Sequence, residues 1–219
     1  MTPTLLLAAH GTESPAGSAT TRELVAAIAA ARPGLDVQLC FLDVATPSLA
    51  TALDGLPGDV VVVPLLLSAG YHVATDIPAV VAGRPNVRVA GHLGPDPLII
   101  AAVADRLLAA RGSQTPVSTA FAAIASSRSS AWGEVNEAVA ALSLAVGRDV
   151  TLLPLGSGAA TTLATLPAPV EVAVYLLAEG TFLGELQASA GTALVAAPIG
   201  VHPLLVSLVL ARYDTAVGP

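Results

Sequence analysis

Short apolar runs alternate with segments of helical spacing along the whole chain. Buried parallel strands are typically continuous apolar runs, and strands that alternate with helices form a parallel sheet covered on both faces. Glycine and proline separate the segments and mark where each of them ends. In the first half of the chain the pattern predicts strands at residues 4–9, 37–42, 59–66 and 87–90.

Helices are expected between these strands. The first is predicted over residues 19–31, before an Arg-Pro-Gly stop. Thr46 and Pro47 have the residue types of a helix cap and a first helical position, so they are expected to open the second helix. A third helix should contain Asp76, and a fourth should begin within residues 94–97 and end near residue 111.

The pattern repeats after a polar linker at residues 111–116. Residues 91–100 align with residues 197–206, which indicates an internal duplication. We therefore expect an α/β fold of two lobes, residues 1–112 and 117–219, each a four-stranded parallel sheet flanked by helices and related by a pseudo-twofold axis. In the second lobe, strands are expected at residues 118–125, 150–153, 170–177 and 193–197, and helices at 131–146, 159–166, 184–190 and 203–213.

Composition narrows the classes of partner. The net charge is −7, and nine Lys and Arg residues are scattered along the chain, which argues against nucleic acid and anionic membranes as partners. The mean hydropathy is high, at +0.75, but the longest apolar stretches contain proline or are too short for a membrane span. The sequence shows no basic leader segment. Cys40 is the single cysteine, so no internal disulfide can form, and a reducing cytoplasm is the expected location.

Two histidines follow the predicted buried strands. His10 comes directly after the first strand, and His72 follows a small-residue turn after the third. In open parallel sheets, ligands bind at the carboxyl edge of the strands. Imidazole ligates borderline divalent metals and titrates near neutral pH. The pair therefore indicates an open, weak metal site, and chance placement at strand ends is the alternative. Asp76, four residues after His72, could orient that imidazole or could be a first-turn acid facing the helix dipole.

The second copy lacks these histidines. Ser126 stands opposite His10 and Phe182 opposite His72, so we expect one metal site per chain, in the first lobe.

Other polar residues have weaker signals. Three acids in or near the predicted edge loops could assist metal delivery or proton transfer, or could be solvated loop charges: Glu13, Glu179 and Glu185. His92 and His202 do not occupy equivalent positions in the two copies, and we interpret both as structural or surface residues. The sequence contains no Gly-x-Gly-x-x-Gly or Walker motif, so no nucleotide cofactor is expected.

Three motifs together resemble the sirohydrochlorin chelatase family. They are Ala-His-Gly at residues 9–11, Phe-Leu-Asp-Val-Ala-Thr-Pro-Ser-Leu at residues 41–49, and Gly-x-His-x-x-x-Asp-Ile-Pro at residues 70–78. Members of this family are ATP-independent class II chelatases that insert cobalt, iron or nickel into a tetrapyrrole, and the second half of the chain resembles the degenerate C-terminal half of the two-domain members. The resemblance implies that His10 and His72 bind the incoming ion and help to remove the pyrrole protons.

The substrate and the metal follow from the same resemblance. It implies that the substrate is a tetrapyrrole such as sirohydrochlorin, in siroheme or cobalamin biosynthesis. The inserted ion would be Fe²⁺ or Co²⁺, and Ni²⁺ is a further candidate. Ser68, Gly70 and Arg128 are candidate substrate contacts. Glu13 stands where the family commonly has arginine, which motivates the alternative of a metal-binding or delivery protein without insertion activity. A monomer suffices, because one chain supplies both walls of a cleft, and a homodimer stays open.

Overall fold

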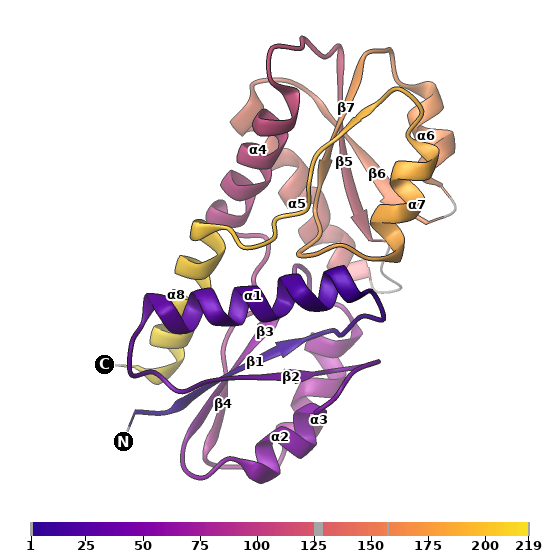
Figure 1. Ribbon diagram of the computed structural model, residues 1–219. Helices are drawn as coiled ribbons and strands as arrows, with labels where there is room; N and C mark the ends of the chain where they lie inside the picture. The colour runs from indigo at the N-terminus through magenta and orange to yellow at the C-terminus, as the bar shows by residue number, and fades with distance from the viewer. Residues whose placement is uncertain (1, 125–128, 157, 219) are drawn as a thin grey trace.

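The computed structural model describes residues 2–124, 129–156 and 158–218, which form two α/β lobes (Figure 1). The sheet of the first lobe has the order β2-β1-β3-β4, and that of the second has the order β6-β5-β7-β8. The strands are β1 Thr4–Ala9, β2 Val37–Phe41, β3 Val60–Leu65, β4 Val87–Val89, β5 Ser118–Ile124, β6 Val150–Leu155, β7 Val170–Val174 and β8 Leu194–Val195. All pairs within both sheets are parallel, so the predicted fold class is confirmed.

Helices connect the strands and cover both sheets. They are α1 Pro15–Ala31, α2 Leu49–Gly55, a π-helix η1 His72–Asp76 that continues into α3 Ile77–Val81, α4 Pro97–Arg111, α5 Ser129–Val146, α6 Ala159–Thr165, α7 Thr181–Ser189 and α8 Pro203–Val217. In the part of the chain that the structure describes, none of these helices is both long enough and apolar enough to cross a membrane.

Some helix starts differ from the sequence prediction, and at α1 and α2 a serine cap explains the difference. Helix α1 begins four residues early, because the Ser14 hydroxyl accepts a hydrogen bond from Gly17 N at 3.2 Å. The prediction that Thr46 and Pro47 open α2 is wrong. Ser48 caps that helix instead, since its hydroxyl accepts from Thr51 N, also at 3.2 Å. Helix α7 begins three residues before its predicted start without a side-chain cap.

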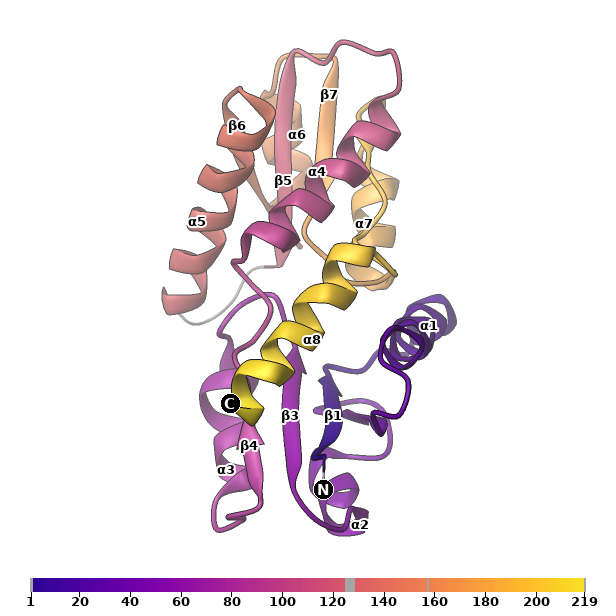
Figure 2. The same ribbon diagram turned by 90° about the vertical axis from the view of Figure 1, so that its left-hand side faces the viewer.

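The last helix of each half packs on the sheet of the other half. Helix α4, from the first half, lies against β7, β8 and α5, and α8, from the second half, lies against β3, β4 and α1. Figure 2 shows α8 running beside the strands of the first lobe, while α4 lies with the second. The division into domains of residues 1–112 and 117–219 stays a prediction. Helices α4 and α8 each pack against elements of the other half.

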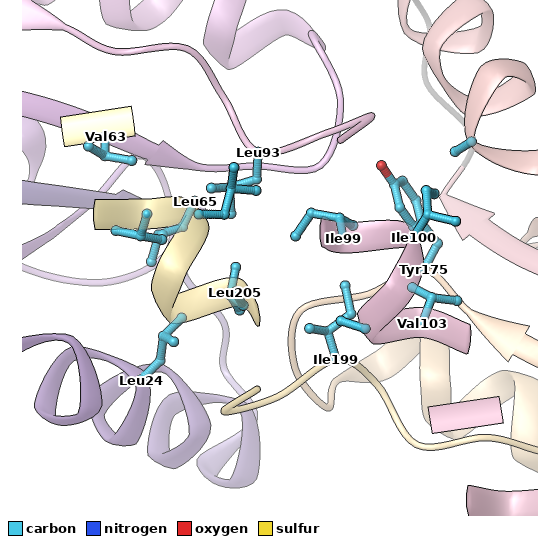
Figure 3. Close-up of a cluster of buried hydrophobic side chains, with 14 of the residues drawn as sticks. Leu24, Val63, Leu65, Leu93, Ile99, Ile100, Val103, Tyr175, Ile199 and Leu205 are labelled. Atoms are coloured by element: carbon cyan, nitrogen blue, oxygen red, sulfur yellow. The ribbon is translucent and has the colours of Figure 1, made fainter. Parts of the chain in front are cut away.

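One hydrophobic core therefore runs through both lobes. It includes buried side chains from β3, α4, β7 and α8 (Figure 3). Val63 and Leu65 of β3 belong to this core together with Leu205 of α8, and Ile99 of α4 lies toward Tyr175 at the end of β7. Burying large aliphatic side chains contributes about 1.5–3 kcal/mol each, so separating the lobes would expose a costly surface. The shared core fixes how the carboxyl edges of the two sheets face each other.

Candidate metal site and inter-lobe cleft

His10 and His72 lie side by side at the carboxyl edge of the first sheet. Strands β1 and β3 are neighbours, with Ala9 paired to Leu65, so residues that follow these two strands emerge close together. His10 directly follows β1, and His72 begins η1 after a short turn. The ring centroids are 4.8 Å apart and the rings meet edge to face, at 85°.

Asp43 joins the two histidines from the other neighbour of β1. Ala9 pairs with Phe41 of β2, and Asp43 N donates to the carbonyl oxygen of His10 at 2.9 Å. The potential ligand atoms of His10, Asp43 and His72 all lie within 4.8 Å of one another, the one such group of three among the residues with described positions. Sequence reasoning did not select Asp43, although it stands one residue beyond a predicted strand, at the expected edge.

The loops that carry this group are tightly constrained. Gly11 has φ of +100°, and a Cβ atom there would lie 2.3 Å from the carbonyl oxygen of Asp43, so only glycine fits. Val44 has a positive φ of 45°, which is rare for a β-branched residue, and its N–H donates to Oδ1 of Asp43 at 2.8 Å. Backbone strain of this kind concentrates at functional sites, where the surrounding structure holds it in place.

Asp76 orients the imidazole of His72. Its Oδ2 lies 2.7 Å from Nδ1 of His72, across one turn of helix, and its side chain makes no capping bond to α3. Of the two interpretations of Asp76, the geometry supports the orienting one. An imidazole that donates Nδ1–H to a carboxylate presents the lone pair of Nε2, which is the usual arrangement for a histidine that binds a metal.

A cleft of about 710 Å³ lies between the lobes and includes both histidines in its wall. Ser68 and Gly70, two of the candidate substrate contacts, also line it, as do Glu13 from the first lobe and Glu179 from the second. Ligand pockets for small molecules span about 300–1,000 Å³, so the cleft has the size of a small-molecule site.

The structure places only some of the remaining candidates. Arg128 and Ser126 lie outside the described residues, and Glu185 is exposed on α7. His202 caps α8, with Nδ1 accepting from Leu204 N at 3.3 Å. His92 lies 3.2 Å from a carboxylate oxygen of Glu134. His92 and His202 make structural contacts and are not members of the metal group.

One protein-family model matches the first lobe. The model of the CbiX family matches residues 4–110. The matched region covers most of the first lobe and just under half of the chain. A search of curated protein sequences finds no match.

Solved structures resemble the whole chain. The sirohydrochlorin chelatase SirB from Bacillus subtilis subspecies spizizenii, in complex with cobalt, is 21% identical with a TM-score of 0.81, over 100% of this chain and 97% of that one. SirB from Bacillus subtilis with Fe³⁺ is also 21% identical, with a TM-score of 0.78 over 99% and 96%. CbiX, the terminal enzyme for siroheme biosynthesis in denitrifying bacteria, is 22% identical, with a TM-score of 0.74 over 98% of this chain and 100% of that one. The chain therefore has the two-lobed fold of these chelatases, as the resemblance of its motifs predicted.

Proposed function

We propose that the protein inserts a divalent metal ion, Fe²⁺ or Co²⁺, into sirohydrochlorin or a related tetrapyrrole, as a step of siroheme or cobalamin biosynthesis. The observation that carries this proposal is the convergence of His10, Asp43 and His72 at the edge of the first sheet, where both histidines line the inter-lobe cleft. The chelatases whose fold the chain shares support the same activity, since they are described with cobalt, with iron and in siroheme synthesis.

The group suits an ion that must be released. Two imidazoles and one carboxylate leave coordination positions open, unlike the four protein ligands that close a structural site. His10 and Asp43 are exposed and His72 is partly exposed, so a macrocycle in the cleft can approach the bound ion from solvent. Imidazole binds iron, cobalt and nickel alike, and Ni²⁺ is therefore a third possible substrate.

Insertion of M²⁺ displaces two protons from the pyrrole nitrogens, so the site must also accept protons. As the ion passes from the imidazoles to the macrocycle, the ring nitrogens of His10 and His72 regain their lone pairs and can each take one proton. Imidazole is the side chain most often used as a general base in enzymes. The carboxylate of Asp76, 2.7 Å from His72, would stabilise the imidazolium that forms there.

The test is an insertion assay with purified protein. Metal-free sirohydrochlorin is incubated with Co²⁺ or Fe²⁺, and the change in absorbance gives the rate. We expect His10→Ala and His72→Ala together to reduce the rate to that of buffer. His202→Asn is the matched control, because it replaces a histidine outside the metal group and the cleft lining and keeps a residue that can cap α8.

Two results would overturn the proposal: a wild-type rate no better than buffer, or an unchanged rate in the double variant. Tight Co²⁺ binding with no tetrapyrrole binding would favour the alternative of a metal-delivery protein, to which Glu13 and Glu179 at the cleft could contribute.

We further propose a cytoplasmic monomer. One chain supplies both walls of the cleft, and the buried thiol of Cys40 fits a reducing compartment. Sedimentation velocity would test the oligomeric state, and a stable dimer would contradict this part of the proposal.

A further inference from the structure

The turn that leads from β3 to His72 is held by side chains of the second lobe. Ala69 N donates to Oε2 of Glu134, on α5, at 2.6 Å. The hydroxyl of Tyr175, at the end of β7, donates to the carbonyl oxygen of Leu67 at 3.0 Å. Both bonds cross between the lobes, and both end within five residues of His72.

The carboxylate of Glu134 is itself held in place. The same Oε2 lies 3.2 Å from Nε2 of His92, and the side chains of both residues are largely buried, at 23% and 19% exposed. The carbonyl oxygen of His92 accepts from Nε of Arg212 at 3.1 Å, and Arg212 also donates to Asp96 at 2.9 Å. Hydrogen bonds to a charged acceptor are about twice as strong as neutral ones, so this carboxylate is a firm anchor for the turn.

Close packing leaves the turn little freedom. A Cβ atom on Gly94 would lie 2.1 Å from the Tyr175 hydroxyl and 2.4 Å from the carbonyl oxygen of Leu67. The loop before α4 therefore packs closely against the hydrogen bond between Tyr175 and Leu67. Leu93 N donates to the carbonyl oxygen of Leu66 at 2.9 Å. Burial, with the nearby carboxylates of Glu134 and Asp96, raises the pKa of Tyr175 and keeps its phenol protonated as a donor.

The held turn continues directly into the helix of His72. Gly70 N donates to Ser68 O at 2.9 Å, and Gly70 O accepts from Ala74 N at 3.1 Å. Any movement of the main chain at Ala69 would therefore be passed to His72 and change its distance to His10 and Asp43.

We propose that Glu134 is a positioning residue, which reaches from the second lobe to fix the turn at residues 67–70 and thereby sets the imidazole of His72 for metal binding. The inference rests on the part of the proposed function that has His10, Asp43 and His72 bind a metal ion, and it does not require that the ion is inserted into a tetrapyrrole. It gives the second lobe a role in the metal site although, among the residues whose placement is described, the metal group draws all its members from the first lobe.

Co²⁺ binding by the full-length protein tests this role. Its visible absorption bands report coordination geometry, and calorimetry gives the Kd. Loss of a residue that orients metal ligands weakens binding about 10–100-fold, and we expect Glu134→Ala to lie near the lower end of that range, with altered Co²⁺ bands. Glu134→Gln should recover most of the loss, because its amide oxygen can still accept from Ala69 N. Glu137→Ala, an exposed glutamate on the same helix, is the matched control and should bind as wild type.

Wild-type Kd and bands in Glu134→Ala would overturn the inference. If that variant does not fold, Tyr175→Phe takes its place, because it removes only the second bond to the turn, and wild-type Kd and Co²⁺ bands in Tyr175→Phe would overturn the inference as well. The proposed function fails separately, if wild-type protein binds Co²⁺ through the histidines but does not insert it.

Discussion

Gly17 lies in the first turn of α1, where that helix passes the main chain of the second lobe. A Cβ atom at this position would lie 2.3 Å from the carbonyl oxygen of Glu179 and 3.0 Å from Cγ2 of Thr12. Real Cβ contacts essentially never fall below 3.0 Å, and the closer neighbour is backbone, so it cannot rotate away. Gly17→Ala must therefore push the lobes apart at the mouth of the cleft.

A second helical glycine serves as the control that separates the cost of this steric clash from the effect of alanine on helix propensity. Gly133 is exposed on α5 and a Cβ atom there would meet nothing within 4 Å. Replacing glycine by alanine inside a helix normally stabilises by about 0.5–1 kcal/mol. Overpacking costs about 1–3 kcal/mol. The free energy of unfolding of Gly17→Ala should therefore be about 1–3 kcal/mol lower than that of Gly133→Ala. Relative to wild type, Gly133→Ala should be stabilised and Gly17→Ala destabilised.

Urea denaturation followed by circular dichroism measures both variants, with the midpoint reporting stability and an unchanged slope confirming the same unfolding reaction. A midpoint for Gly17→Ala that rises as far as that for Gly133→Ala would refute the close approach of the lobes at this point.

Three further predictions concern stability and reactivity. Glu171 is fully buried and paired with Arg111, so Glu171→Ala should cost about 3–5 kcal/mol in urea unfolding by leaving the guanidinium without its partner, and a loss below about 1 kcal/mol would contradict the pairing. Burial raises the pKa of Cys40 to about 12, so the native thiol should resist alkylation at pH 8 and react only in urea, and rapid native labelling would contradict this. The hydrogen bond from Arg32, aided by its charge, lowers the pKa of Asp214, so this pair stabilises the fold above the ordinary aspartate pKa and loses its effect as pH falls through the lowered value. Because the pair is exposed, Asp214→Asn should cost no more than about 1 kcal/mol at pH 7 and nothing in strong acid, and an equal cost at both pH values would argue against the ion pair.

The sequence was most informative where apolar runs are continuous. Strands β1 and β3 are buried along their whole length, and this is why their ends, and the histidines that follow, could be placed at one edge. Asp43 was missed because β2 is only partly buried and its place beside β1 depends on pairing, which no local pattern records. A carboxylate after a strand is too common to select without that adjacency.

Neither the exchange of α4 and α8 nor the role of Glu134 could be predicted from local patterns. Both helices are apolar enough to cover either sheet, and only the packing of the complete chain decides which sheet each one meets. In the sequence, Glu134 has the pattern of an ordinary acidic residue on a helix. Its contact with Ala69 joins residues 65 positions apart, so no local pattern indicates it.

A crystal soaked in Co²⁺ and measured at the cobalt absorption edge would locate the ion directly. We predict an anomalous peak within bonding distance of a ring nitrogen of His10, a ring nitrogen of His72 and a carboxylate oxygen of Asp43, with the ion open toward the cleft. A cobalt ion bound by other residues, or no ordered cobalt at this edge of the sheet, would contradict the assignment of these three side chains as the metal site.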